Sequence, residues 1–232
     1  MPKELTVVIP VYNEEEIIQE VVNDWVSTLT KMQIEYDINI YNDGSKDNTL
    51  AKLTELGRNN KSVKVIDKKN SGHGPTILRG YKQCDTEWVF QVDSDNEMRS
   101  EHFSKIWGLR QDYDLILGRR ENRISPFSRK IVSFISRLTI KLFYGPGVYD
   151  VNSPYRLIRR ENFVPYFKNI PENTFAPNLI LAGIAAKRKF RVKEVIIPCQ
   201  IRKTGEVSIK KWKLIKAALK SFSQTITFAF KL

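Results

Sequence analysis

Two carboxylates placed two residues apart, Asp93 and Asp95, are the side chains of this sequence best suited to chemistry. They directly follow the apolar segment 88–92. In an extended segment, residues i and i+2 point to the same side, so both carboxylates can approach one hard divalent cation. Such a cation typically bridges a diphosphate and neutralises the charge that develops as the diphosphate leaves. The pair therefore predicts metal-assisted departure of a diphosphate.

Three other polar segments could contribute to the same site. In residues 42–49 (NDGSKDNT), a glycine turn can cap the following helix, and the Asp43 carboxylate can accept a hydrogen bond from a ring N–H of a nucleotide base. Residues 10–14 would line that base with backbone and with the ring of Tyr12. In residues 70–74, Gly72 and Gly74 would let the backbone approach a ligand closely, whereas His73 is expected to be solvated.

These segments need strands that end at a common edge, and the hydropathy pattern predicts such strands. Strand-like apolar runs, many of them β-branched, occupy residues 5–11, 36–41, 63–67 and 88–92. Helical signals separate these runs, with Asn13 as the expected cap of the first helix and further helices at 47–56 and 75–83. This alternation predicts an α/β doubly wound sheet whose ligands bind at the carboxyl ends of the strands.

The second half of the chain has a different sequence pattern from the first, with more basic residues and longer helical segments. Residues 115–117 resemble one more strand, which leads into a basic loop at 118–120. Residues 127–143 and 210–230 place apolar side chains at helical spacing with lysines and arginines between them, so both are expected to form basic amphipathic helices. The chain is therefore divided into a catalytic domain, residues 1–206, and a helical appendage, residues 207–232.

Composition excludes several classes of protein. With 232 residues, 41% of them hydrophobic and 11% aromatic, the chain can bury a core, which excludes disordered, collagen-like and disulfide-scaffold proteins. The net charge of +12 suits nucleic acid, an anionic membrane surface or phosphorylated substrates. No apolar stretch approaches the roughly 20 residues of a membrane span. Without a secretory signal layout, the expected location is the cytoplasm, with Cys84 and Cys199 as reduced thiols.

Several motifs together resemble glycosyltransferase family 2, whose members have the GT-A fold, a mostly parallel sheet flanked by helices. The first half carries the resemblance in residues 7–14 (VVIPVYNE), 42–49 (NDGSKDNT) and 93–95 (DSD). The second half resembles the dolichyl-phosphate mannose synthase and bactoprenol glucosyltransferase branch in residues 118–120, 128–133, 153–157 and 202–208. Two departures stand out: Ser153-Pro154-Tyr155-Arg156 replaces the usual Ser-Gly-Phe-Arg, and the Gln-x-x-Arg-Trp motif of processive synthases is absent.

The resemblance implies a role for each matching residue. It implies nucleotide binding by Pro10, Tyr12, Glu14 and Asp43, and binding of Mg²⁺ or Mn²⁺ and the diphosphate by Asp93, Asp95 and Glu97. With Gly72, Gly74 and Ser94 these residues form the predicted nucleotide-sugar site. The resemblance further implies that the acceptor phosphate is held by Arg120, Arg129, Ser133 and Arg202. Arginine suits this role because its guanidinium binds phosphate in a bidentate manner.

The predicted reaction is displacement at the anomeric carbon of a UDP- or GDP-sugar, with inversion, by the phosphate of a polyprenyl phosphate. A phosphate monoester, with a second pKa of about 6, is already ionised at neutral pH and needs orientation and charge screening rather than deprotonation. The basic amphipathic helices would attach the protein peripherally to the cytoplasmic face of the membrane. Asp93, Asp95, Arg120, Arg129 and Asp150 are the predicted catalytic residues.

Two alternatives compete with this prediction. Transfer to a hydroxyl of a glycan or lipid-linked saccharide would need a general base, for which Asp150 is the candidate. A nucleic-acid binder would instead explain the charge, but it would place aromatic and basic residues together on an exposed sheet. Here the strands are apolar and the basic residues fall on predicted helices and acceptor loops, which disfavours nucleic acid as a partner.

Overall fold

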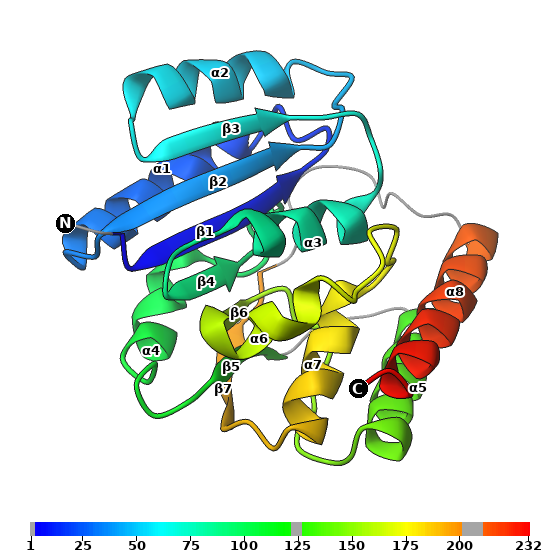
Figure 1. Cartoon of the computed structure of the whole chain (residues 1–232). Helices are drawn as coiled ribbons and strands as arrows, with labels where there is room; N and C mark the ends of the chain where they lie inside the picture. Colours follow the sequence, from blue (N-terminus) through cyan, green and yellow to red (C-terminus); the bar gives the residue numbers. More distant parts are fainter. Residues whose placement is uncertain (1–2, 122–126, 201–210) are drawn as a thin grey trace.

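The computed structural model describes residues 3–121, 127–200 and 211–232, and within these ranges it describes the side chains of all residues except 127–130 and 211–217. The described strands form one seven-stranded sheet (Figure 1). The order of the strands is β3-β2-β1-β4-β6-β5-β7. The strands are β1 (Leu5–Val11), β2 (Tyr36–Asn42), β3 (Val63–Asp67), β4 (Trp88–Gln91), β5 (Leu115–Glu121), β6 (Arg156–Arg159) and β7 (Val192–Pro198). The helices are α1 (Ile18–Lys31), α2 (Thr49–Asn59), α3 (His73–Gln83), α4 (Phe103–Trp107), α5 (Phe127–Phe143), α6 (Arg160–Phe167), α7 (Pro177–Lys187) and α8 (Lys211–Ala229), with a 3₁₀ turn at Ser100–His102.

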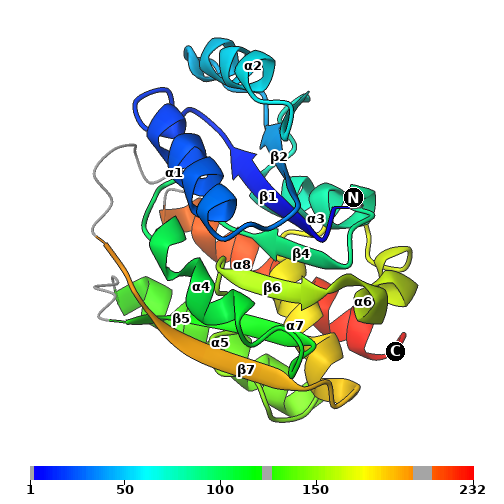
Figure 2. The same cartoon turned by 90° about the vertical axis from the view of Figure 1, so that its left-hand side faces the viewer.

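All strands except β6 run in one direction. Strand β1 pairs in parallel with β2 and β4, β2 with β3, and β5 with β7, whereas β6 is antiparallel to both β4 and β5. The sheet is therefore mostly parallel, as the sequence predicts. Strands β1 to β4 all end at one edge, on the side of the molecule where α5 and α8 stand (Figures 1 and 2).

Each face of the sheet is covered by helices, which explains the continuous apolar runs of the central strands. Val7 and Ile9 of β1 belong to a core cluster with Trp25 of α1. Phe90 of β4 packs in the same cluster, with its ring centroid 5.2 Å from that of Trp25. Val8 points the other way, into a second cluster formed with α3 and α7. In Figure 1, α3, α6 and α7 lie in front of the sheet and α1 lies behind it.

The predicted start of the first helix is wrong. Helix α1 begins at Ile18, and its N-cap residue Ile17 makes no side-chain capping bond. Asn13 instead adopts a left-handed backbone conformation, with φ 54°, and its Oδ1 accepts a hydrogen bond from Lys46 N at 2.8 Å. Asn13 thus joins two loops and caps no helix.

The second half contains elements that the sequence pattern missed. The predicted basic loop at Gly118-Arg119-Arg120 is part of β5, because this strand continues along β7 as far as Glu121. Helix α7 carries no polar stripe, since every residue from Pro177 to Ala185 is buried, so helical periodicity gave no signal there. Neither β6 nor β7 was predicted.

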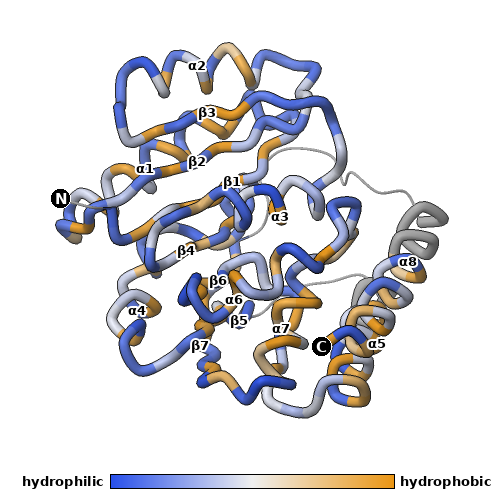
Figure 3. The backbone as a smooth tube through the Cα atoms, viewed as in Figure 1, coloured by the Kyte–Doolittle hydropathy of each residue, from blue (hydrophilic) through white to orange (hydrophobic). Residues whose placement is uncertain are grey.

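Helices α5 and α8 form a pair at one side of the molecule, and α8 also contacts α7 (Figure 3). Tyr144 Oη donates a hydrogen bond to Thr225 O at 2.6 Å, and the rings of Phe143 and Phe230 lie 6.2 Å apart. The proposed boundary between residues 206 and 207 falls outside the described residues. No helix in the described ranges combines the length and the apolar character that crossing a membrane requires.

An ion pair ties the start of β5 to the start of β7, and it supports a prediction about acid stability. Asp114 accepts hydrogen bonds from Arg191 N at 2.8 Å, Nε at 3.2 Å and Nη2 at 2.8 Å. Burial alone would raise the pKa of Asp114, but the bonds from Arg191 lower it below its ordinary value. Asp114→Asn is expected to lower the free energy of unfolding at pH 7 by about 1–2 kcal/mol, because a charge-assisted contact is lost.

The loss of stability caused by Asp114→Asn should depend on pH. A carboxyl whose folded-state pKa is depressed stabilises the protein above its unfolded pKa of about 3.9 and loses that contribution as the pH falls through the folded-state pKa. The gap between wild type and variant, measured by urea unfolding, should therefore shrink below about pH 4. Asp85→Asn, which changes an exposed carboxylate, is the control. Its free energy of unfolding should stay close to that of wild type at every pH. A gap that is constant with pH would contradict the assignment.

Candidate active site

The loops that follow β1 to β4 meet at the carboxyl edge of the sheet, as the sequence predicts. Hydrogen bonds link these loops in sequence order: Asn13 N donates to Ser45 Oγ at 3.0 Å, Ser71 N donates to Asp43 Oδ1 at 2.8 Å, and His73 Nε2 lies 2.9 Å from Asp93 Oδ1. Each loop is therefore positioned by its neighbours as well as by its own strand.

The first loop presents one ring to solvent and buries one carboxylate. Pro10 lies within β1 opposite Tyr41 and is buried. Tyr12 is exposed, whereas Glu14 is buried and its backbone N donates to Thr49 Oγ1 at 2.9 Å. The loop after β2 thus holds the loop after β1 in place, so that Tyr12 projects beyond the edge of the sheet.

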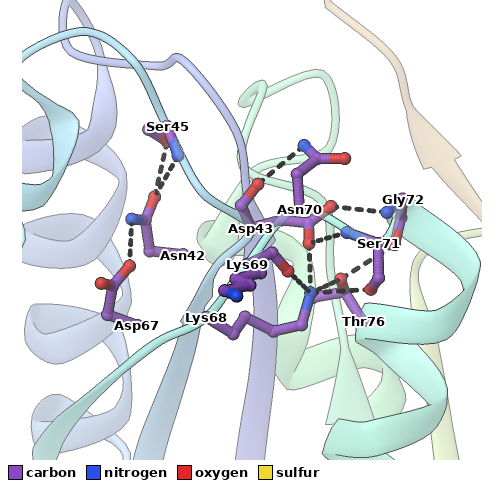
Figure 4. Close-up of polar contacts among 10 residues, drawn as sticks. All are labelled: Asn42, Asp43, Ser45, Asp67, Lys68, Lys69, Asn70, Ser71, Gly72 and Thr76. Carbon is purple, nitrogen blue, oxygen red and sulfur yellow. Dashed lines mark hydrogen bonds and ion pairs between the residues drawn. The ribbon is translucent and has the colours of Figure 1, made fainter.

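Asp43 is the centre of a dense polar network, shown in Figure 4. Its Oδ1 accepts hydrogen bonds from Lys68 Nζ and Ser71 N, and its Oδ2 accepts one from Gly72 N at 2.9 Å. Lys68 Nζ also contacts Ser71 Oγ at 2.8 Å and Thr76 Oγ1 at 3.1 Å. The buried Asp43 carboxylate therefore organises residues 68–72. One acceptor position remains on Oδ2 within these contacts, since a carboxylate oxygen accepts two hydrogen bonds.

The two glycines of the third loop have different roles. Gly72 has φ 94°, a conformation that favours glycine, and it directs its N–H to Asp43. A Cβ at Gly74 would lie 2.0 Å from the carbonyl oxygen of Phe175. The close approach that Gly74 permits in the structure is to this backbone, and its contact with a nucleotide-sugar stays a prediction.

Asp93 and Asp95 lie on a turn rather than on an extension of β4. The strand ends at Gln91, and residues 94–95 form the turn, so strand alternation does not place the two carboxylates. Asp93 Oδ1 accepts a hydrogen bond from Gln91 Nε2 at 3.0 Å, and Asp95 Oδ1 accepts one from Glu97 N at 3.1 Å. Ser94 is buried between them.

His73 is exposed, as expected, but it is also paired with a carboxylate. Desolvation by the surrounding loops lowers the pKa of His73, but the carboxylate of Asp93, with smaller effects from Asp95 and Asp43, outweighs it and raises that pKa above its ordinary value. The imidazole thus becomes a cation more readily than a solvated histidine does, beside three carboxylates.

The carboxylates of the turn fit a divalent cation that a substrate helps to bind. No three His, Cys, Asp or Glu side chains form a metal cluster within residues 3–121, 127–200 and 211–232. Asp93, Asp95 and Glu97 nevertheless offer hard oxygen donors on one short segment. Mg²⁺ is commonly bound by one or two carboxylates together with substrate phosphates, so this donor set suits a cation completed by a diphosphate.

An ion pair joins Arg120, near the end of β5, to Asp150 in the segment before β6, on the predicted acceptor side. Arg120 Nη2 donates to Asp150 Oδ1 at 3.0 Å and Arg120 Nε donates to Asp150 Oδ2 at 3.3 Å, and both side chains are largely buried. Glu194 Oε1 fixes this loop by accepting hydrogen bonds from the backbone N of Tyr149 and Asp150. The structure therefore brings together Arg120, which is predicted to hold the acceptor phosphate, and Asp150, which is the predicted general base of the alternative transfer to a hydroxyl.

The other predicted acceptor residues are placed only in part. Ser133 is exposed on α5, one turn after Arg129, whose side chain is not described. Arg202 lies outside the described residues. Arg156, from the predicted acceptor motif, is fully buried and donates hydrogen bonds to the backbone carbonyls of Val151, Ser153 and Asn178. Arg156 therefore supports the backbone of the predicted acceptor loop from within the core and is not exposed on its surface.

Two residues of the site were missed in the sequence. Lys68 directly follows β3, so its place at the carboxyl edge was a usable signal. Gln91 is the single amide within the buried run WVFQV, and a polar residue there needs a buried partner. Both contact a predicted site residue: Lys68 contacts Asp43 and Gln91 contacts Asp93.

Comparisons with known proteins identify the family of the chain. The family model for glycosyl transferase family 2 matches residues 6–167. The undecaprenyl-phosphate 4-deoxy-4-formamido-L-arabinose transferase of Proteus mirabilis is 28% identical over 192 residues, which are 82% of this chain and 58% of that relative. An uncharacterized glycosyltransferase of Synechocystis sp. is 28% identical over 230 residues, covering 94% of this chain and 68% of the relative.

A solved structure shows the same fold. Glucosyl-3-phosphoglycerate synthase from Mycobacterium tuberculosis, in complex with Mn²⁺, UDP-glucose and phosphoglyceric acid, superposes with a TM-score of 0.71 at 14% sequence identity. The match covers 98% of this chain and 80% of that one.

Proposed function

The chain belongs to glycosyl transferase family 2 and is a glycosyltransferase with the family's fold, and we propose that it transfers a sugar from a UDP- or GDP-sugar to the phosphate of a polyprenyl phosphate. The proposed transfer is a direct displacement that inverts the anomeric carbon. The observation that carries the choice of acceptor is the ion pair of Arg120 with Asp150.

That ion pair favours a phosphate acceptor over a hydroxyl acceptor. A general base must lie within hydrogen-bond range of the hydroxyl that it deprotonates. Both oxygens of Asp150 already accept hydrogen bonds from Arg120, which makes Asp150 a poor candidate for that base. Among the residues that the structure describes, Arg120 donates to Asp150 through Nε and Nη2, which leaves three of its five N–H groups for an anion. We propose that these donors, with Arg129, Ser133 and Arg202, hold the acceptor phosphate.

The donor side is proposed to form from the loops after β1, β2, β3 and β4. The exposed ring of Tyr12 would cover the base, Asp43 Oδ2 would accept its ring N–H, and Glu14 and the Gly72 backbone would line the site. Asp93, Asp95 and Glu97 would hold Mg²⁺ or Mn²⁺. When bound, the cation would supply charge neutralisation for the leaving diphosphate. His73, beside Asp93, would add positive charge at the same edge when its imidazole is protonated.

The relatives support both halves of this proposal. The Proteus mirabilis relative is named as an undecaprenyl-phosphate transferase. The Mycobacterium tuberculosis structure contains Mn²⁺ and UDP-glucose. The chain spans 58% of the length of the Proteus relative, so the activity is proposed for the part that this chain shares with it.

The chemistry of the product tests the acceptor. A panel of UDP- and GDP-sugars is incubated with the protein, Mn²⁺ and a polyprenyl phosphate in detergent. The expected product is a glycosyl phosphate, so mild acid should release the sugar. An acid-stable product formed with a lipid-linked saccharide would instead support transfer to a hydroxyl and would overturn the phosphate assignment.

We also propose that α5 binds an anionic membrane at the cytoplasmic face. Five apolar side chains form one exposed stripe on α5, each between 37% and 69% exposed: Ile131, Phe134, Ile135, Leu138 and Leu142. Their spacing places them on one face of the helix, and lysines and arginines flank them. A net charge of +12 and a lipid acceptor favour a bilayer over a protein partner for this stripe.

The double substitution Phe134→Ser/Leu142→Ser is expected to weaken binding to anionic vesicles by about tenfold or more, because each buried apolar side chain contributes about 1.5–3 kcal/mol. Co-sedimentation with vesicles that contain phosphatidylglycerol measures the effect. Val164→Ser is the matched control, since Val164 is equally exposed as Ile135 but lies on α6. Unchanged sedimentation of the double variant would contradict the docking role.

A further inference from the structure

A buried chain of amide groups leads from the core to Asp93. Gln91, at the end of β4, is fully buried. Its Oε1 accepts a hydrogen bond from Asn178 Nδ2 at 2.8 Å, and its Nε2 donates to Asp93 Oδ1 at 3.0 Å. Asn178 lies in the first turn of α7 and is also buried. The side-chain amide of Gln91 thus connects the Asp93 carboxylate with helix α7.

Tyr81 of α3 sets the direction of this chain. Its Oη lies 3.0 Å from Asn178 Oδ1 and 3.4 Å from Gln91 Oε1, and only the hydroxyl can donate in these contacts, of which the one to Asn178 is the shorter. Burial raises the pKa of Tyr81 above its ordinary value, so the hydroxyl keeps its proton. With Oδ1 of Asn178 accepting from Tyr81, Nδ2 must face Gln91, and the Gln91 amide must direct its own N–H to Asp93. Tyr81, Asn178 and Gln91 therefore act as a relay whose donors all point toward the site.

The relay ends at one oxygen of the Asp93 carboxylate, which His73 also contacts. Asp93 Oδ1 accepts from Gln91 Nε2 and contacts His73 Nε2 at 2.9 Å, and these two partners hold the carboxylate from different elements. His73 is exposed, but the relay is sealed in the core. A leucine at position 91 would fill a similar volume without any polar group that needs a partner, so the amide is costly unless its hydrogen bonds are used.

We propose that Gln91 is a positioning residue for Asp93, and that Asn178 and Tyr81 fix the direction in which the Gln91 amide donates. This inference rests on the proposed function, because it assigns to the relay the orientation of a carboxylate that serves the cation and the diphosphate. Partners that orient a metal-binding carboxylate typically change metal affinity or activity by 10- to 100-fold when they are removed.

Asn178→Asp gives the sharpest test, because it replaces one side-chain nitrogen by oxygen at a residue that is linked to Asp93 through Gln91. A carboxylate at position 178 can only accept from Gln91, so the Gln91 amide turns over and presents Oε1 to Asp93. Gln91→Leu removes the relay altogether. Both variants are expected to weaken Mn²⁺-dependent binding of UDP or GDP, measured by calorimetry with the nucleotide that the wild type binds, by about tenfold or more.

The double variant separates the relay from general destabilisation. In Gln91→Leu/Asn178→Asp, the second change should add no further loss of nucleotide binding, since no amide remains to be turned. Thr86→Val is the matched control. It removes buried hydrogen bonds to Thr6 Oγ1 and to Trp88 O, both at 2.8 Å, at the opposite end of β4. It should lower the urea midpoint without changing the dissociation constant.

Three outcomes would overturn the inference. Dissociation constants within twofold of wild type in both single variants would do so, as would losses that multiply in the double variant. The third outcome needs no ligand: the NMR signals of the Gln91 side-chain amide should shift in ligand-free Asn178→Asp, and unchanged signals would overturn the relay. A wild type that binds neither nucleotide would instead overturn the proposed function, while the ligand-free measurement would still decide the relay.

Discussion

Replacing Asp95 with asparagine is expected to lower kcat/KM for sugar transfer by about 10²- to 10³-fold, because loss of a carboxylate ligand removes several kcal/mol of charge stabilisation at the leaving diphosphate. Asparagine keeps the shape of the side chain and the acceptor oxygen that receives the hydrogen bond from Glu97 N. The turn should therefore persist, and the loss should reflect charge rather than folding.

The measurement is the initial rate of sugar transfer with Mn²⁺ varied from micromolar to millimolar. Wild type should lose its activity in EDTA and recover it with added Mn²⁺, whereas Asp95→Asn should recover little at any concentration. Asp112→Asn, an exposed carboxylate away from the carboxyl edge, provides the control and should respond to Mn²⁺ as wild type does. Undiminished turnover of wild type in metal-free buffer would refute the metal assignment.

Replacing Arg120 with glutamine is expected to lower kcat/KM for the acceptor by about 100-fold, while KM for the nucleotide-sugar stays within about twofold. Two effects add in this variant. The guanidinium that would hold the acceptor phosphate is lost, and the largely buried Asp150 carboxylate is left without its partner. An unpaired negative charge beside the acceptor site repels a phosphate.

A second substitution separates these two effects. Arg120→Gln/Asp150→Asn removes the negative charge that the single variant leaves behind, so it should recover part of the lost acceptor affinity. Thermal unfolding of both variants controls for stability. If Asp150→Asn alone lowers kcat by 10²- to 10⁴-fold while Arg120→Gln is mild, Asp150 is a general base and the acceptor is a hydroxyl.

The first half of the fold could be predicted from the sequence because each strand there is a short apolar run followed by a separate helix. The predicted segments at 5–11 and 63–67 coincide with β1 and β3. Hydrophobic periodicity did not predict the elements whose sequences lack an alternation of apolar and polar residues. Strand β6 has four residues with arginine at both ends, and α7 is buried on all sides, so neither shows the periodicity that marks an amphipathic element.

The loops of the site could be predicted for the same reason, since parallel strands bring their carboxyl ends to one edge. The contacts within the loops could not, because they join residues far apart in the chain. Asn13 resembled a helix cap but binds Lys46, and Gly74 resembled part of a ligand cradle but packs against Phe175. Asp43 is occupied by Lys68, which no local pattern indicates. Such pairings depend on tertiary register, which a single sequence does not contain.

The reversed direction of β6 has an evolutionary consequence. Arg156, the first residue of β6, lies opposite Gln91 at the end of β4, so the segment before β6 enters the site at the edge where the parallel strands leave it. The proposed acceptor loop therefore precedes the start of a strand, whereas the proposed nucleotide loops follow the ends of others. On this proposal, insertions or deletions in residues 145–150 would change the acceptor without shifting the register of β1, β2 or β4. A lineage would then exchange one substrate and keep the residues that bind the other.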